Sequence, residues 1–273
     1  MRVHLTVAVI LAGALAGCTS APLSQLQETT PNGSAVSRAL AGAYTQFAAV
    51  EVTEMIDLKD GEYFAHKGLK AAQGGEPAPE VVADWGVEGD SAVNLQEARN
   101  RLAAALANRP DDAVPKVAAS AQVGFDCWIE QLEEDFQPGD IEICRQAFAA
   151  SVSTLERRKD YPQSVFFDLN AADLTPGAKK RIQVLADRAM RLGVPRITVL
   201  GHADRTGSES HNLTLSLRRA DTVERALVGA GVASDRVGVA AAGEYKTRIA
   251  TADGVLEPQN RRVELLFQPV VGW

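Results

Sequence analysis

The chain has 273 residues, a net charge of −7 and 46% hydrophobic residues, which is enough material for one large or two smaller globular domains. The charge is unevenly divided, because residues 18–163 carry 12 Lys and Arg against 23 Asp and Glu, whereas residues 164–273 carry 15 against 12. The acidity of the first half argues against nucleic acid as a partner.

The first residues have the anatomy of a secretory signal peptide, here residues 1–17. Arg2 supplies a basic start, and the apolar run that follows it is shorter than the roughly 20 residues a membrane-spanning helix needs. The run ends in Leu-Ala-Gly-Cys, which resembles a bacterial lipobox. The resemblance implies cleavage before Cys18 and acylation of that cysteine, with palmitate as a typical chain, so that lipid tethers the mature protein to a membrane. The alternative is an ordinary signal peptide with a chance cysteine.

Residues 18–34 are polar, contain Pro and Gly and lack periodicity, so we expect a flexible tether. Residues 35–160 predict an acidic, all-α domain of four or five helices. The first of these starts near Ser34, where apolar residues begin to recur at helical spacing. Asn94 and Glu97 predict a capping box at the start of a later helix.

Two cysteines, Cys127 and Cys144, flank a turn predicted at residues 137–140 in a helical hairpin. An exported protein folds in an oxidising compartment, so we expect these cysteines to form a disulfide. They do not form a CxxC redox motif, and two cysteines alone are a poor metal site.

From residue 163 onward, strands alternate with helices, and residues 163–268 predict a second domain with a short tail at 269–273. The expected class is α+β, with a helical N-terminal region followed by a small mixed sheet backed by helices. The predicted strands lie within 163–170, 196–204, 235–243 and 261–268. The predicted helices run from Pro176 to Gly193 and from near Leu213 to Gly229 or Gly231.

The segment 201–220 contains two histidines, an aspartate and two adjacent arginines that are candidate functional residues of this second domain. Asp204 follows a predicted strand, and Arg219 lies about two turns into the next helix, so the two side chains could flank one groove. A carboxylate binds an ammonium group and a guanidinium forks onto a carboxylate, so the pair suits a zwitterionic, amino-acid-like ligand. The alternative from spacing alone is a salt bridge between Asp204 and Arg219 that holds strand to helix.

Metal and catalytic interpretations are weaker. His202, Asp204 and His211 are possible metal ligands, but their spacing matches no known motif. The serines lack a GxSxG elbow, and hydrolysis by two carboxylates would need Glu209 or Glu244 near Asp204. We therefore expect no enzyme activity, metal or cofactor, and a cell-wall hydrolase is the less favoured alternative.

The residues of this region resemble the signature of the OmpA-like C-terminal domain family, of the peptidoglycan-associated lipoprotein type. The matching positions are Gly201-His202-Ala203-Asp204, Thr206-Gly207, Asn212, Leu215-Ser216, Arg219-Ala220, Gly231-Val232, Arg236, Gly243-Glu244 and Asn260-Arg261-Arg262-Val263. The resemblance implies non-covalent binding of peptidoglycan through the diaminopimelate residue of its stem peptide. It assigns the ligand's ammonium to Asp204 and its carboxylate to Arg219.

Three further residues have lesser expected roles. The resemblance implies that Asn212 supports the loop, and that Asp168 and Arg262 line or brace the pocket. The segment 245–259 departs from the family pattern, since Thr247 stands where a proline is frequent, so the stem-peptide preference could differ.

The resulting expectation is a lipoprotein in the inner leaflet of the outer membrane that faces the periplasm and grips the cell wall. Thr19 is not the aspartate that retains lipoproteins in the inner membrane of enterobacteria, which favours the outer membrane. The alternative is an envelope scaffold whose helical domain binds protein partners.

Overall fold

The computed structural model describes residues 20–108, 114–135, 137–156 and 163–269. The signal peptide expected at residues 1–17, the acylated Cys18 and the end of the tail, 270–273, lie outside these ranges. None of the helices within them combines the length and the apolar character that a membrane crossing requires.

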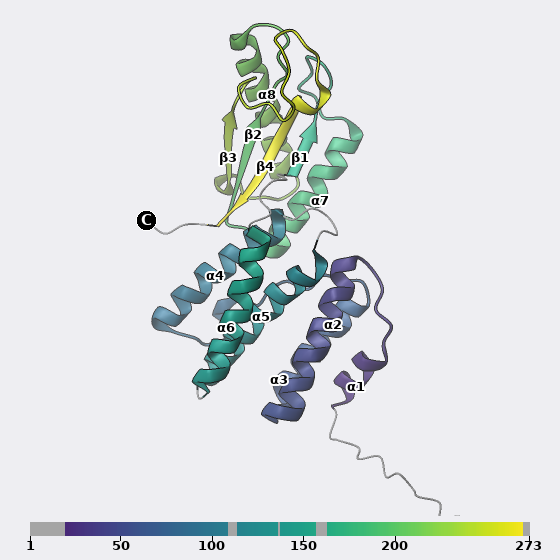
Figure 1. Cartoon of the computed structure of the whole chain (residues 1–273), viewed down its shortest axis with the longest axis vertical. Coiled ribbons are helices and arrows are strands. Elements are labelled where there is room, and N and C mark those ends of the chain that lie inside the picture. The colour runs from purple at the N-terminus through teal and green to yellow at the C-terminus, as the bar shows by residue number, and fades with distance from the viewer. Residues whose placement is uncertain (1–19, 109–113, 136, 157–162, 270–273) are drawn as a thin grey trace, which may run out of the picture.

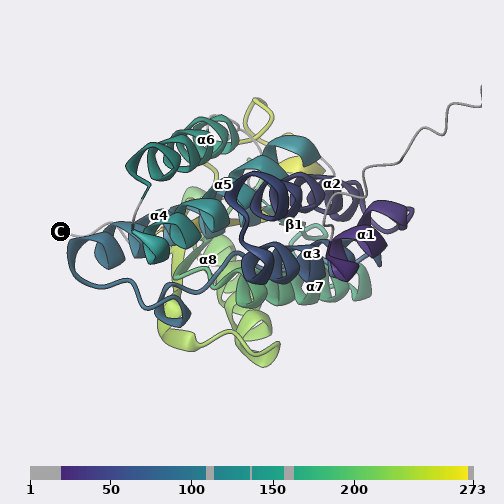
Figure 2. The same ribbon diagram turned by 90° about the horizontal axis from the view of Figure 1, so that it is seen from below.

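The N-terminal region is helical, as expected, and forms the lower part of the molecule in Figure 1. Seen from below, α5 lies between α6 on one side and α2 on the other (Figure 2). Ser34 caps the amide of Ser37 at the start of α2, at the position predicted for that helix. The helices are α1 (Ala21–Glu28), α2 (Ala35–Val50), the π-helical turn η1 (Glu51–Met55), α3 (Leu58–Ala72), the short η2 (Val82–Asp84), α4 (Gly89–Asn108), α5 (Pro115–Glu134) and α6 (Pro138–Glu156).

The expectation of a flexible tether over residues 18–34 is wrong for the part that the structure describes. Residues 21–28 form α1, which starts after the N-cap Ser20 and packs against α3. Leu23 and Leu26 are buried, and Leu26 contacts Gly68 of α3, where no larger side chain would fit. Burial of these two leucines stabilises a helix that is too short to be stable alone.

Two details of the later helices bear on the sequence predictions. α4 begins at Gly89, five residues before Asn94, so the expected capping box lies inside the helix. The hairpin of α5 and α6 is present, and a disulfide joins Cys127 to Cys144 with their Cα atoms 5.6 Å apart.

The C-terminal region is the expected small mixed sheet with helices packed on it. The strand order is β1-β4-β2-β3, with β2 parallel to β3 and antiparallel to β4, and β1 antiparallel to β4. Val165, Val199 and Leu265 are buried in one cluster with side chains of α7 and α8. The elements are β1 (Gln163–Phe166), α7 (Pro176–Leu192), β2 (Arg196–Gly201), α8 (Glu209–Gly229), the short η3 (Ser234–Arg236), β3 (Val237–Ala241), the short η4 (Pro258–Asn260) and β4 (Arg262–Gln268).

Helices α4, α5 and α6 share one hydrophobic core with the sheet, whereas the buried residues of α1, α2 and α3 form a second cluster. Leu102 and Leu106 of α4 belong to the same buried cluster as Leu265 and Phe267 of β4. At the junction, the Asn108 side chain donates to the carbonyl of Phe267 at 2.6 Å and accepts from its amide at 3.0 Å. The two regions are therefore packed together by apolar and polar contacts.

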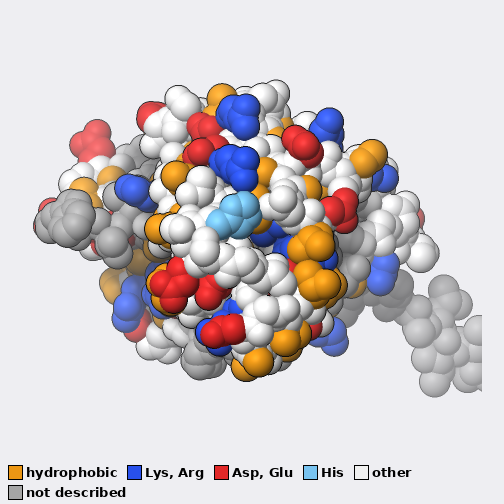
Figure 3. Space-filling model, turned by 90° about the horizontal axis from the view of Figure 1, so that it is seen from above, with side chains coloured by type: hydrophobic (Ala, Val, Ile, Leu, Met, Phe, Trp, Pro, Cys, Tyr) orange, Lys and Arg blue, Asp and Glu red, His pale blue; other side chains and the backbone are white. Residues whose placement is uncertain are grey.

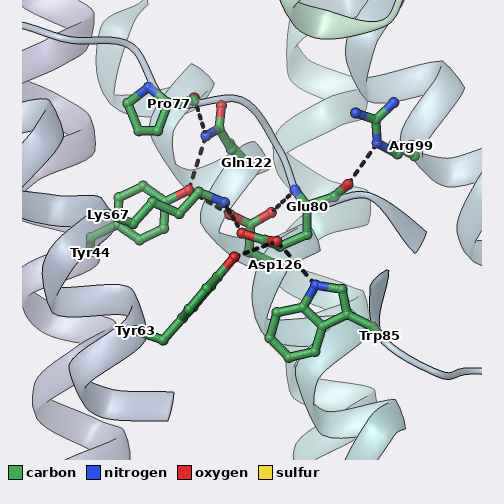
Figure 4. Close-up of polar contacts among 9 residues, drawn as sticks. All are labelled: Tyr44, Tyr63, Lys67, Pro77, Glu80, Trp85, Arg99, Gln122 and Asp126. Carbon is green, nitrogen blue, oxygen red and sulfur yellow. Dashed lines mark hydrogen bonds and ion pairs between the residues drawn. The ribbon is translucent and has the colours of Figure 1, made fainter. Parts of the chain in front are cut away.

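A buried polar network crosses the helical region (Figure 4). Lys67 of α3 forms ion pairs with Glu80 and with Asp126 of α5, whose carboxylate also accepts from Tyr44 at 2.5 Å. The carbonyl of Glu80 accepts from Arg99 of α4 at 2.6 Å. The network thus connects α2, α3, α4 and α5 through the segment that precedes α4.

Candidate functional site

The segment 201–220 lies where β2 ends, at the end of the sheet that is uppermost in Figure 1 and remote from the helical region. Figure 3 looks onto this end, where acidic, basic and hydrophobic side chains lie among one another. The amide of Ala203 donates to the carbonyl of Gly243 at 2.8 Å, which joins the β2–α8 loop to the loop after β3. Two loops distant in sequence therefore build this end together.

Gly201 allows α8 to approach the end of β2. A Cβ atom at this position would lie 1.9 Å from the carbonyl oxygen of Ser216, which is backbone and cannot swing away. The Ser216 hydroxyl donates to the carbonyl of Leu213 and accepts from the amide of Gly243. These contacts fix the start of α8, and with it Arg219, against the strand that leads to Asp204.

Asp204 is buried, with 3% of its surface exposed, and its carboxylate is anchored on both oxygens. The Thr206 hydroxyl donates to Oδ1 at 2.7 Å, and Arg261 Nη1 donates to Oδ2 at 3.0 Å. A carboxylate has about four lone-pair positions, so Asp204 retains the capacity to accept from a further cation.

Arg219 is fully buried, and its guanidinium donates to three backbone carbonyls. Nε donates to Ala171 at 2.8 Å, Nη1 to His202 at 3.0 Å and Nη2 to Asp168 at 3.1 Å. It also stacks over the ring of Phe167. A guanidinium has five N–H groups, so two remain for a carboxylate.

The charge of Arg219 is retained at neutral pH. Burial lowers the pKa of its guanidinium to about 10, the neighbouring Asp204 raises it, and Arg261 and Arg218 lower it. Because this pKa still lies well above 7, Arg219 remains a cation. In the described residues Arg261, rather than Arg219, forms the ion pair with Asp204, so the alternative of a strand-to-helix salt bridge between Asp204 and Arg219 is not what the structure has.

The other candidate residues occupy different surroundings. Asn212 is buried and donates to the carbonyl of Thr206 at 3.0 Å and to Glu244 at 2.6 Å, so it holds the β2–α8 loop. Asp168 has an exposed side chain, and it meets Arg219 only through its backbone carbonyl. Arg262 is buried and donates to Glu264 at 2.8 Å and to the carbonyl of Lys246 at 3.2 Å.

The two histidines are separated. His202 is buried, with Nε2 3.5 Å from Glu264, whereas the exposed His211 pairs with Asn170 at 3.0 Å. Within the described ranges, no group of three or more His, Cys, Asp or Glu side chains is arranged to hold a metal ion. Glu209 pairs with the hydroxyl of Tyr245 and Glu244 with Asn212, so neither lies free beside Asp204.

Arg261 is the functional candidate that sequence reasoning did not select. It stands beside Arg262 at the start of β4, and neighbouring residues on a strand point to opposite faces. In β4 the apolar residues Val263, Leu265 and Phe267 recur at every second position and are buried. This alternation, which is visible in the sequence, could have predicted that Arg261 and Arg262 point to opposite faces.

Comparison with known proteins identifies the same region. A family model described as the OmpA family matches residues 166–261. An outer membrane protein of Gluconacetobacter diazotrophicus is 33% identical over 109 residues, which are 38% of this chain and 29% of that protein. The peptidoglycan-associated lipoprotein of Legionella pneumophila is 37% identical over 73 residues, which are 27% of this chain and 42% of that protein.

These matches span less than half the length of either relative. Among solved structures, the peptidoglycan-associated lipoprotein of Burkholderia pseudomallei is 28% identical with a TM-score of 0.37, and its alignment covers 39% of this chain and 90% of that one.

Proposed function

Because residues 166–261 form an OmpA family domain, we propose that this protein binds peptidoglycan non-covalently, through the diaminopimelate residue of a stem peptide. The observation that carries the proposal is a carboxylate and a guanidinium close together at one end of the sheet: Arg219 donates to the carbonyl of His202, two residues before Asp204, and interacts electrostatically with the Asp204 carboxylate. The name of the Legionella relative associates that protein with peptidoglycan, which supports the same ligand here.

Each half of a zwitterionic ligand has a partner in this arrangement. The ammonium of the ligand would donate to the Asp204 carboxylate, which already accepts from Thr206 and Arg261. The carboxylate of the ligand would accept hydrogen bonds from the two remaining N–H groups of Arg219. Since Arg219 is fully buried under the loop that carries Asp168 and Ala171, binding requires that loop to move aside. No bond is made or broken, so the role is binding and not catalysis.

We further propose that acylation of Cys18 anchors the chain in the outer membrane, facing the periplasm. The described chain starts at Ser20 beside α1, in the helical half of the molecule, whereas the candidate site lies at the opposite end (Figure 1). An anchor at Cys18 would place the sheet domain away from the bilayer and towards the cell wall. The protein would then link the membrane to peptidoglycan without a membrane-spanning helix.

The test is retention of residues 19–273 on purified peptidoglycan sacculi. Wild type should sediment with the sacculi, and Asp204→Ala and Arg219→Lys should each lower retention at least tenfold, because each removes one half of the ligand contact. Asp221→Asn and Arg218→Ala are matched controls, since both residues are exposed on α8. Equal retention of wild type and both site variants, with folding verified by circular dichroism, would disprove the assignment of the site.

A further inference from the structure

Two carboxyl groups are buried where α2 runs into η1 beside the C-terminal part of α5. Glu51 is 1% exposed and Glu130 is 0% exposed. They interact electrostatically with one another, although they come from elements far apart in the sequence. Neither residue belongs to the candidate peptidoglycan site, and the polar network of Figure 4 contains neither.

Within the part of the chain that the structure describes, neither carboxyl group is paired with a cation. Among the described residues, no basic side chain lies within ion-pair distance of Glu51 or Glu130. Oε2 of Glu51 and Oε1 of Glu130 have no hydrogen-bond partner, and the side-chain amide of Gln131 donates through Nε2 at 2.9 Å to Oε2 of Glu130. Burying an unpaired carboxylate costs several kcal/mol, so such a group holds its proton instead.

Nearby acidic side chains further favour the protonated forms of Glu51 and Glu130. The acidic side chains that act on one or both groups come from three helices: Asp57 and Asp60 at the start of α3, Glu134 at the end of α5, and Asp140 at the start of α6. The nearby cation Lys59 lowers the pKa of Asp60. Burial first, and then these acidic neighbours, raise the pKa of Glu51 to about 7 and that of Glu130 to about 8.

The backbone beside the pair is itself unusual. Residues 51–55 form a π-helical turn, and Ile56 after it is left-handed with φ 61° while its side chain is 80% exposed. Left-handed backbone is unfavourable for a β-branched residue, and π-helical turns are rare. The backbone amide of Asp57 donates to the backbone carbonyl of Glu51 at 2.8 Å, so the strained turn begins at the residue that carries one of the buried carboxyl groups.

We propose that the buried carboxyl groups of Glu51 and Glu130 form a proton-controlled switch: the α2–α3 turn stays packed on α5 while both are protonated and is released when they ionise. Loss of either proton places a negative charge in a buried acidic cluster. The turn, as the strained element, is the part that opens. The helical region would thereby respond to external pH independently of the ligand site.

The direction of the pH effect follows from the two protonation states. In the unfolded chain both groups ionise near their ordinary value of 4.5, whereas in the folded chain they ionise near 7 and 8. The stabilisation is therefore complete below about pH 4.5 and is lost as pH rises to about 8. Over that interval the opening equilibrium of the turn should rise about tenfold per pH unit for each carboxyl group.

The test is amide hydrogen exchange of residues 48–62 in residues 19–273, measured between pH 5 and 8.5 and corrected for the intrinsic rate. Protection should fall steeply with pH in wild type and stay nearly flat in Glu51→Gln with Glu130→Gln. Glu133→Gln, an exposed neighbour on α5, should behave like wild type. A flat wild-type profile, or an unchanged slope in the double variant, would overturn the proposal.

A second measurement serves if the double variant does not fold. Carbon-detected NMR titration of the wild-type glutamate carboxyls reports the protonation of Glu51 and Glu130 directly. Two resonances that titrate between pH 6.5 and 8.5 and disappear in the respective single Gln variants would support the proposal. Titration of the Glu51 and Glu130 carboxyls near the ordinary pH of 4.5 would refute it.

Discussion

Arg261 Nη1 lies 3.0 Å from Asp204 Oδ2, so the candidate ligand-binding carboxylate already has a cationic partner within the protein. The guanidinium of Arg261 also donates through Nε to the carbonyl of Phe167 at 3.2 Å, immediately before the loop that covers Arg219. Arg261 thus links the Asp204 side of the site to the loop on the Arg219 side.

Replacing Arg261 with Gln should destabilise the fold by about 3 kcal/mol, because it leaves a buried carboxylate without its cation. Urea unfolding of Arg261→Gln against wild type measures this loss. The exposed Arg218→Gln on α8 is the control and should change stability by less than about 0.5 kcal/mol. If the double variant Arg261→Gln with Asp204→Asn is no more stable than Arg261→Gln alone, the ion pair does not account for the loss.

The secondary structure around the site could be predicted from the sequence, but not which of Arg261 and Arg262 would contact Asp204. The strands and helices of residues 163–268 follow from local signals, such as the Thr175–Pro176 helix start, and the structure confirms them. Which arginine of an adjacent pair reaches Asp204 depends on strand register, and a shift of one residue reverses it.

The helical region was less predictable because its elements depend on distant partners. α1 forms through burial of Leu23 and Leu26 against α3, and neither leucine marks a helix in its local sequence. The pairing of Glu51 with Glu130 likewise arises only when α2 and α5 pack together. A polar or acidic segment therefore gives no local sign of the tertiary contacts that order it.

Removal of the disulfide should lower stability by about 3 kcal/mol. The two cysteines are separated by 17 positions, and a crosslink that closes a loop of this length restricts the unfolded chain by roughly that amount. The double variant Cys127→Ala with Cys144→Ala, which leaves no free thiol in the hairpin, can be compared with wild type by urea unfolding. A reductant should lower the stability of wild type and leave the double variant unchanged. Identical midpoints for oxidised wild type and the variant would contradict the expectation.

Glu264 should make the sheet domain sensitive to acid. Burial raises the pKa of its carboxyl, but the interactions with nearby His202 and with Arg262, which donates a hydrogen bond, outweigh this and lower it to about 2. Arg262, at 2.8 Å, is the closer partner, since His202 Nε2 is 3.5 Å away. A depressed pKa contributes stability that is present above the ordinary value of 4.5 and is lost as pH falls towards 2, about 3 kcal/mol in total.

Thermal unfolding between pH 2 and 6 tests this expectation. Wild type should lose more stability on acidification than Glu264→Gln, whose side chain cannot titrate. Glu97→Gln, an exposed position on α4, should keep the wild-type slope. Parallel profiles of wild type and Glu264→Gln would show that this carboxyl does not drive the acid response.

Asp126 should be among the most sensitive positions of the helical region. Its carboxylate is fully buried and accepts from Lys67, from Tyr44 and, at 2.9 Å, from the amide of Glu80 (Figure 4). Asp126→Ala leaves the Lys67 ammonium with one carboxylate in place of two and removes the acceptors of the Tyr44 hydroxyl and of the buried backbone amide of Glu80. The expected loss is about 3–5 kcal/mol in the free energy of unfolding, measured in urea.

Two further variants distinguish the loss of the polar network from the loss of side-chain volume in Asp126→Ala. Asp90→Ala, at an exposed position of α4, should cost less than about 0.5 kcal/mol. Lys67→Met should cost less in the Asp126→Ala background than in wild type, because in wild type it leaves two buried carboxylates without their cation and in the variant only that of Glu80. If the double variant is less stable than Asp126→Ala by the full cost of Lys67→Met alone, the two side chains are not coupled as the 2.6 Å contact between them predicts.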